Sequence, residues 1–177
     1  MKIIIPLGGK DSEFRSEFGC IKPLTLLGGH RMIEIFLKKF QFKNEIIFLC
    51  TKDDLINTNL LSVLQNLKQK KKIIPIGNNT TSVIETVNYA EKLIDDDESV
   101  LICHPDSINN FNSIANVKNK LLKTKLDGYM FAFDEDCPTN TIETQTGRVQ
   151  LKNNKIIKIN EKSIKTIDSL RFNYLVY

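Results

Sequence analysis

Two consecutive glycines follow an apolar segment near the start of the chain, in the run "KIIIPLGGKDSEF" (2–14). Glycine adopts positive φ at little cost and lets backbone N–H groups approach a phosphate, so Gly8 and Gly9 could form a phosphate-binding turn. A plain tight turn explains the pair equally well, because the run matches neither GxxxxGK[ST] nor GxGxxG. The acidic residues Asp11 and Glu13 follow, where a phosphate would favour positive charge. Whether a nucleotide site operates here therefore depends on the rest of the chain.

Strand-like and helix-like segments alternate from the N-terminus to about residue 123. Short apolar runs predict buried strands at 2–7, 45–50, 72–77 and 99–106. Helical spacing of apolar residues predicts helices between the strands, and Ser82 with Glu85 forms a capping box for the third of them. A further helix is expected at about 112–123. The expected buried faces are Ile33, Leu37 and Phe40; Ile56, Leu60, Val63, Leu64 and Leu67; and Val83, Val87, Ala90 and Ile94.

The last part of the chain carries short strand-like runs at 129–133, 147–151, 155–159 and 172–177. Alternating βα units followed by strands predict a single α/β domain over 1–177. Its expected architecture is a three-layer α/β/α fold with a mostly parallel (Rossmann-like) sheet and an antiparallel C-terminal extension. Such sheets bind ligands at the carboxyl ends of their strands, near the point where strand order reverses. The loops at 8–22, 77–82 and 104–110 are therefore the expected site.

The composition excludes several classes of protein. With 41% hydrophobic and 26% charged residues and a net charge of +4, the chain reads as an ordinary soluble globular protein. The basic run "KQKKK" (68–72) ends a helix-like stretch, where positive charge suits the helix dipole and solvent better than a nucleic acid. No leader pattern and no run of 18 apolar residues is present, so we expect a cytoplasmic protein without membrane insertion.

The cysteines are too widely spaced for a metal or redox motif. No CxxC pair occurs among Cys20, Cys50, Cys103 and Cys137, which argues against zinc and against a redox dithiol. Cys50 and Cys103 close apolar runs, so we expect them to be reduced core residues.

Several segments, taken in order, resemble the sugar-phosphate nucleotidylyltransferases. The run "PLGGKDSEF…IKPLTLLGGHRMIE" is similar to the family's P-M-A-G-x-G-S-R-F, P-K-P-L and G-K-P-M-I-E segments. "VLICHPD" resembles its fourth strand, which ends in a metal-binding aspartate. "GRVQLKNNKIIKINEK" resembles the later strand pair that ends in Glu-Lys, and "FNYLVY" the strand after it. The resemblance spans almost the whole chain. It implies transfer of a nucleoside monophosphate from an NTP to a sugar phosphate, or a similar phosphorylated precursor, with release of pyrophosphate, in surface polysaccharide biosynthesis.

The resemblance also implies roles for individual residues. Lys22 matches the family lysine that contacts the phosphates and Asp106 matches its Mg²⁺ ligand, so these two are the catalytic candidates. Glu161 and Lys162 match a pair on the sugar-phosphate side. The nucleotide-binding candidates are Leu7, Gly8, Gly9, Lys10, Arg15 and Ser82. Plain structural roles remain open for these residues, such as a surface lysine, a turn, a solvated strand end and a helix cap.

Two features depart from the family pattern. When the segments are aligned on Ser12 and Phe14, Asp11 replaces the second glycine and Glu13 replaces the signature arginine. A charge-assisted bond worth about 1.5–3 kcal/mol is then missing, unless Lys10 or Arg15 supplies it. The family's second metal-binding aspartate comes from a segment beyond residue 177, where this sequence ends on an apolar strand. That ending suggests truncation, a homo-oligomer or a partner chain at the sheet edge.

Two other functions remain open. One is a catalytically inactive nucleotide- or sugar-binding relative or assembly subunit, which Asp11 and Glu13 favour. The other is a glycosyltransferase of the same architecture, although "HPDSI" has one acid where such enzymes usually carry D-x-D. We expect His104 to be a loop or core histidine and His30 to be exposed.

Overall fold

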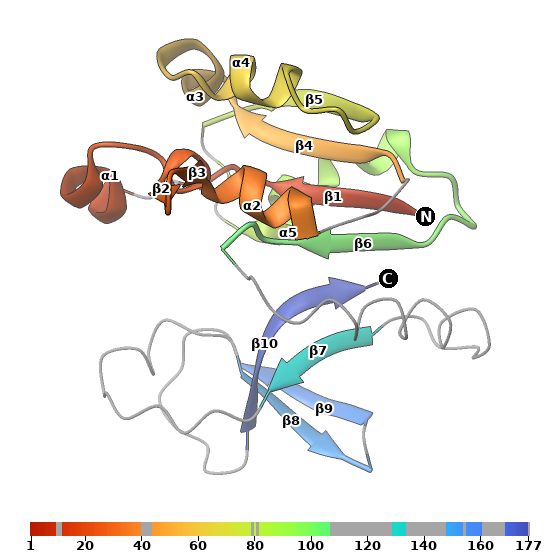
Figure 1. The fold of residues 1–177 in the computed structure, drawn as a ribbon. Helices are drawn as coiled ribbons and strands as arrows, with labels where there is room; N and C mark the ends of the chain where they lie inside the picture. Colours follow the sequence, from red (N-terminus) through yellow and green to blue (C-terminus); the bar gives the residue numbers. More distant parts are fainter. Residues whose placement is uncertain are drawn as a thin grey trace.

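The computed structural model describes residues 1–9, 12–39, 44–78, 80, 82–106, 129–133, 148–153, 155–160 and 169–176. Within these residues an eight-stranded sheet forms the centre of the fold (Figure 1). Its strand order is β5-β4-β1-β6-β10-β8-β9, with β7 paired to β10. The bounds of the four parallel strands are β1 (Lys2–Pro6), β4 (Ile46–Thr51), β5 (Lys71–Ile76) and β6 (Val100–Cys103).

Strands β1, β4 and β6 are buried on both faces, which explains their continuous runs of apolar residues, whereas β5 lies at the edge of the sheet and is partly exposed. Ile3 of β1 pairs with Ile46 on one side and with Leu101 on the other. Because successive side chains of a strand point to opposite faces, odd and even positions divide between two cores. One core contains Ile3, Ile5, Ile46, Phe48, Cys50, Leu101 and Cys103, and the other contains Ile4, Ile47, Leu49, Val100 and Ile102.

Helices cover both faces of the parallel part, which confirms the predicted three-layer α/β/α architecture. Residues of α2 (Met32–Lys39) and α4 (Leu60–Gln65) belong to the first core, and α3 (Lys52–Asn57) lies beside them. Residues of α5 (Val83–Asn88) and of the short 3-10 helix η2 (Glu91–Leu93) pack on the second core, together with Ala90. No helix in the described part of the chain is long and apolar enough to cross a membrane.

The helix expected to carry the apolar face from Ile56 to Leu67 is two helices, α3 and α4. The Thr58 hydroxyl donates to the Asp54 carbonyl at 2.6 Å and accepts from the Leu60 N–H at 3.1 Å. These bonds end the first helix and start the second, so the chain changes direction there. Leu60, Val63 and Leu64 are buried as expected, but Ile56 lies before the break and is 77% exposed.

The other helical faces are also partly corrected. Phe36 is fully buried in α2 beside Ile33 and Leu37, although the pattern did not single it out. In α5 the buried residue is Thr86, whereas Val83 is 41% exposed because it lies in the first turn, before the residues that contact the sheet. Phe40 and the helix expected at 112–123 lie outside the described residues.

The predicted antiparallel extension is confirmed. Strand β10 pairs antiparallel with β6, β7 and β8, and β9 pairs antiparallel with β8, so β10 joins the extension to the parallel strands. A shift of register between Phe172 and Tyr174 marks an irregularity in the pairing of β10 with β7. The bounds of these strands are β7 (Tyr129–Phe133), β8 (Arg148–Lys152), β9 (Lys155–Asn160) and β10 (Ser169–Val176).

The segment between β1 and α2 has structure that the sequence analysis did not anticipate. It contains α1 (Ser12–Phe18), the 3-10 helix η1 (Lys22–Leu24) and a small hairpin of β2 (Leu26–Leu27) and β3 (His30–Arg31). Gly28 and Gly29 form the hairpin turn with φ values of 58° and 82°, which favour glycine. His30 is exposed in this hairpin, as expected.

Candidate functional site

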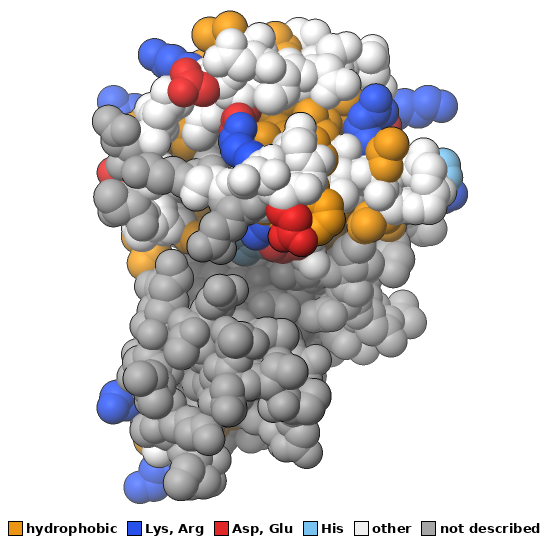
Figure 2. Space-filling model, turned by 90° about the vertical axis from the view of Figure 1, so that its left-hand side faces the viewer, with side chains coloured by type: hydrophobic (Ala, Val, Ile, Leu, Met, Phe, Trp, Pro, Cys, Tyr) orange, Lys and Arg blue, Asp and Glu red, His pale blue; other side chains and the backbone are white. Residues whose placement is uncertain are grey.

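Strand order reverses beside β1. The chain runs from β1 to β4 and β5 on one side, and β6 then pairs with β1 on the other side. The loops that leave β1 and β6 therefore diverge from neighbouring carboxyl ends, which is where α/β sheets bind ligands. Figure 2 views the molecule from the side where these strands end, and acidic, basic and histidine side chains lie close together near the middle of the view.

The glycine turn begins directly after β1. The Leu7 N–H donates to the Leu49 carbonyl at 2.8 Å and so continues the pairing of β1 with β4. A Cβ atom on Gly8 would lie 2.5 Å from Ile76 Cδ1 and 3.6 Å from Thr86 Cγ2. Close packing against β5 and α5 is thus a sufficient reason for glycine at position 8. Gly9 follows and is exposed.

The structure brings together the two catalytic candidates. Lys22 Nζ lies 4.0 Å from Asp106 Oδ2, although the two residues are far apart in the sequence. Lys22 begins η1, where the buried Pro23 fixes the backbone of the first turn. Asp106 follows β6, and both side chains are partly open to solvent, with exposed fractions of 37% and 46%. A cation and a carboxylate thus stand at the switch point of the sheet.

His104 lies next to this pair. Burial lowers the pKa of His104, the charge of Asp106 raises it, and the charge of Lys22 lowers it. The lowered pKa means that the neutral imidazole is favoured. The expectation of a loop or core histidine agrees with this position at the buried end of β6.

Arg15 pairs with a carboxylate that the sequence pattern did not single out. Its Nη2 donates to Asp54 Oδ1 at 2.6 Å, and the Asp54 side chain is only 3% exposed. The only sequence signal for Asp54 is an acidic residue in the first turn of a helix. Because such residues are common at helix starts, the pattern could not reveal a partner 39 residues away.

Ser82 serves as the N-cap of α5. Its Oγ accepts from the Glu85 N–H at 3.1 Å, as the capping box predicted. The cap explains Ser82 without a ligand, and its nucleotide-binding role remains a prediction.

The remaining candidates have no described side chain. Lys10, Asp11, Glu161 and Lys162 lie outside the described residues, as does the side chain of Glu13. Their roles, and the replacement of the signature arginine by Lys10, remain predictions.

Metal binding in the described part of the chain would depend on Asp106. No group of three or more His, Cys, Asp or Glu side chains there is arranged to hold an ion. Mg²⁺ usually binds proteins through one or two carboxylates and takes its other ligands from substrate phosphates and water. A single accessible carboxylate beside a lysine fits that mode, so the residues present are compatible with Mg²⁺ that enters with a nucleotide.

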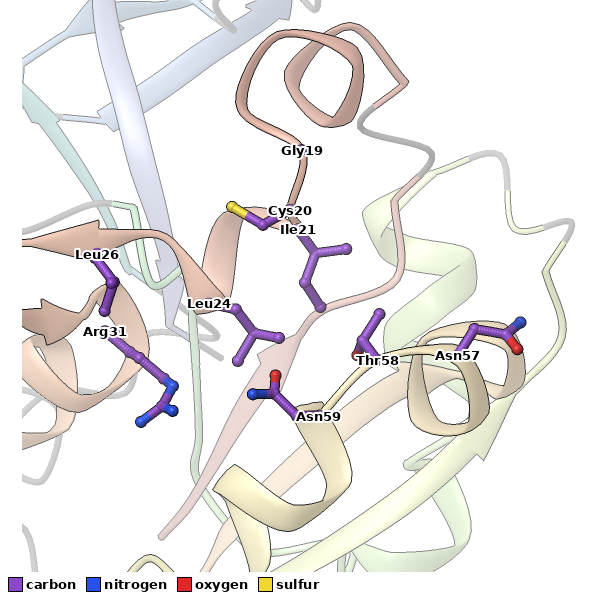
Figure 3. Close-up of a pocket in the computed structure, with 9 residues that line it drawn as sticks. All are labelled: Gly19, Cys20, Ile21, Leu24, Leu26, Arg31, Asn57, Thr58 and Asn59. Carbon is purple, nitrogen blue, oxygen red and sulfur yellow. The ribbon is translucent and has the colours of Figure 1, made fainter.

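A separate pocket of about 380 Å³ lies behind the Lys22 segment. In Figure 3, Leu24 of η1, Arg31 of the hairpin and Asn59 at the start of α4 point toward one another across it. Neither Lys22 nor Asp106 lines this pocket. The other lining residues are Gly19, Cys20, Ile21, Leu26, Asn57 and Thr58.

The expectation for Cys50 and Cys103 is confirmed. Cys50 and Cys103 are fully buried and reduced. Burial, with a smaller effect from the charge of Asp54, raises the pKa of Cys50 to about 12, and burial also raises the pKa of Cys103. Both thiols are therefore unreactive core groups.

The sheet, its switch point and its antiparallel extension define a class: over its whole length the chain has the fold of the sugar-phosphate nucleotidylyltransferases. The inositol-1-phosphate CTP transferase from T. maritima matches 99% of this chain with 69% of its own, with a TM-score of 0.77 and 14% identity. A Bacillus anthracis protein assigned as a glucose-1-phosphate thymidylyltransferase matches 100% of this chain with 71% of its own, with a TM-score of 0.74 and 18% identity. A UDP-glucose pyrophosphorylase matches 99% of this chain with 75% of its own, with a TM-score of 0.71 and 12% identity.

These matches are structural. No family model matches the chain, and no curated protein matches its sequence. Identities of 12 to 18% establish the fold that the sequence resemblance predicted, and they leave the reaction of this chain to be argued from its own residues.

Proposed function

We propose that the protein is a nucleotidylyltransferase that transfers a nucleoside monophosphate from an NTP to a sugar phosphate, or a similar phosphorylated precursor of surface polysaccharide, and releases pyrophosphate. The observation that carries the proposal is the proximity of Lys22 and Asp106, 4.0 Å apart at the switch point of a nucleotidylyltransferase fold. Both residues are the ones that the family resemblance assigned to the phosphates and the metal.

The proposed chemistry needs positioning and charge neutralisation more than a covalent nucleophile. The acceptor phosphate attacks the α-phosphorus of the NTP, and pyrophosphate leaves. The Lys22 ammonium binds phosphate oxygens and stabilises the negative charge that develops on them. The N–H groups of the Gly8–Gly9 turn line the floor of the phosphate site.

Asp106 is the residue that would hold Mg²⁺, and the bound ion would supply further neutralisation of the phosphate charge. When a nucleotide is absent, the same carboxylate neutralises Lys22 instead. Glu161 and Lys162 are proposed to contact the sugar phosphate.

An inactive nucleotide-binding relative is the second candidate. It is favoured by the acidic Asp11 and Glu13 in the turn and by the pairing of Arg15 with Asp54, since no arginine is then assigned to the triphosphate.

The test is thermal unfolding of the purified chain with CTP, GTP, dTTP or UTP, each with and without Mg²⁺. A nucleotide at 100 times its dissociation constant should add roughly 2.7 kcal/mol to the free energy of unfolding. We expect one nucleotide to raise Tm in a magnesium-dependent manner, and Asp106→Asn to abolish the dependence on magnesium. Lys22→Gln should weaken binding, whereas Lys52→Gln, a change of an exposed lysine on α3, should not.

Pyrophosphate release with a panel of sugar phosphates then separates the two candidates. A Tm shift without turnover supports the inactive relative. No shift with any nucleotide contradicts both.

A further inference from the structure

Helix α1 lies between the glycine turn and Lys22 in the sequence, and an ion pair between Arg15 and a buried carboxylate holds it in place. The helix has seven residues, fewer than an isolated helix needs for stability in water, so tertiary contacts must fix its position. Its partner in the ion pair, Asp54, belongs to α3 and is 2% exposed.

Asp54 is itself held rigidly. Its N–H donates to the Thr51 hydroxyl at 3.2 Å, and its carbonyl accepts from the Thr58 hydroxyl at 2.6 Å. A buried carboxylate is costly unless a charged partner compensates it, so Arg15 cannot leave Asp54 without a penalty. The Arg15–Asp54 pair thus acts as a fixed attachment point for α1.

The residue before Arg15 in the helix contacts the candidate phosphate-binding lysine. Lys22 Nζ lies 5.8 Å from the centroid of the Phe14 ring, within the range of a cation–π interaction. The Phe14 ring also stacks on Phe18, with centroids 4.4 Å apart, which limits its rotation. Lys22 is therefore flanked by the Phe14 ring and by the Asp106 carboxylate.

We propose that Arg15 and Asp54 are positioning residues: their ion pair holds α1 so that Phe14 orients the Lys22 ammonium toward the phosphate site. In this role Arg15 acts through Phe14 and does not contact the nucleotide. The proposal rests on the proposed function for its catalytic meaning, while the contact between Phe14 and Lys22 can be tested without any substrate.

The test uses the full chain with its lysines ¹³C-dimethylated, which preserves their charge. The Lys22 signal is assigned by its loss in Lys22→Arg. A methyl group above an aromatic ring is shifted upfield, so we expect an upfield Lys22 signal that Phe14→Leu removes. Arg15→Gln and Asp54→Asn should each remove the upfield shift, and the double variant should resemble either single variant, because both remove one interaction.

Arg31→Gln is the matched control. It breaks a second arginine–carboxylate pair, Arg31–Glu34 at 3.1 Å, in the neighbouring hairpin and helix, and it should leave the Lys22 signal unchanged. Amide spectra of every variant show whether it is folded. If Asp54→Asn unfolds the chain, Arg15→Gln and Phe14→Leu still decide the question.

Nucleotide affinity, measured with the same NTP panel, distinguishes positioning from direct contact. Under the proposal, Arg15→Gln and Asp54→Asn weaken binding to the same extent. If Arg15 instead binds phosphate, Arg15→Gln weakens binding while Asp54→Asn, which releases the guanidinium, preserves or strengthens it; that result overturns the proposal. An unchanged Lys22 signal in both variants also overturns it. If the wild-type chain binds no NTP, the proposed function fails, and the Lys22 signal still decides whether the pair orients the lysine.

Discussion

Gly8 shows how one residue can have a structural and a functional explanation at once. Its type and its place after a strand predict a phosphate turn, and the structure adds that a Cβ atom there would lie 2.5 Å from Ile76 Cδ1, so the buried isoleucine would have to shift. The packing constraint acts between the turn after β1 and Ile76 at the end of β5, and β4 separates these two strands in the sheet. The sequence therefore shows the glycine but not the contact with Ile76 that disfavours a side chain at this position.

Gly8→Ala should destabilise the chain by about 1–3 kcal/mol, because the new methyl overlaps the Cδ1 atom of a fully buried isoleucine. Urea unfolding measures the change. Adding Ile76→Val removes the overlapping atom, so the double variant should be no less stable than Ile76→Val alone. Gly77→Ala is the control, since its Cβ would meet only Tyr89 Oη at 3.4 Å. A neutral Gly8→Ala would mean that Ile76 moves aside freely.

At the scale of elements, local signals predicted where helices start better than where they end. Ser82 caps α5 as its capping box indicates, because a cap depends on residues three positions apart. The break between α3 and α4 depends on the Thr58 hydroxyl, which bonds to Asp54 in one helix and to Leu60 in the next. The helical spacing of apolar residues continues across this break. The pattern therefore predicted one helix where the structure has two.

Ser82→Ala should lower the free energy of unfolding by about 1 kcal/mol, because the Glu85 N–H loses its acceptor. Ser82→Asp is the matched variant: it retains a capping oxygen and should remain close to wild type in stability. Both values come from urea unfolding. Equal losses in the two variants would contradict the capping role.

At the scale of the whole molecule, the start of the chain is tied to the segment before β6. Glu98 forms ion pairs with Lys2, whose Nζ lies 2.8 Å from Oε2, and with the N-terminal ammonium, 3.3 Å from Oε1, so it links the starts of two neighbouring central strands. The hydrogen bond from Lys2 is the largest cause that lowers the pKa of Glu98 below its ordinary value of 4.5, and it outweighs the opposing effect of burial.

A carboxyl group whose pKa is lowered in the folded state stabilises the fold fully when the pH is above its ordinary pKa. This stabilisation is lost as the pH falls through the folded-state pKa. We therefore expect the stability of the wild type to exceed that of Glu98→Gln at neutral pH, and the difference to shrink as pH falls below 4.5. Urea unfolding across that pH range measures it. Glu91→Gln, at an exposed position on η2, is the control. A difference that is independent of pH would show that Glu98 acts by packing and not by charge.

The sequence alone was enough to predict the α/β class, the four parallel strands and the antiparallel extension, and its resemblance to a family singled out Lys22 and Asp106 as catalytic candidates. These features follow from local periodicity and from ordered motifs, which are properties of neighbouring residues. The folded structure was needed to show that Arg15 binds Asp54, that Phe14 lies near Lys22, and that a side chain at position 8 would displace Ile76. Each of these contacts joins different elements, and their geometry is fixed by strand order and by the angle at which short helices leave the sheet. Composition and residue spacing do not specify that angle, so these contacts can be identified only from the folded structure.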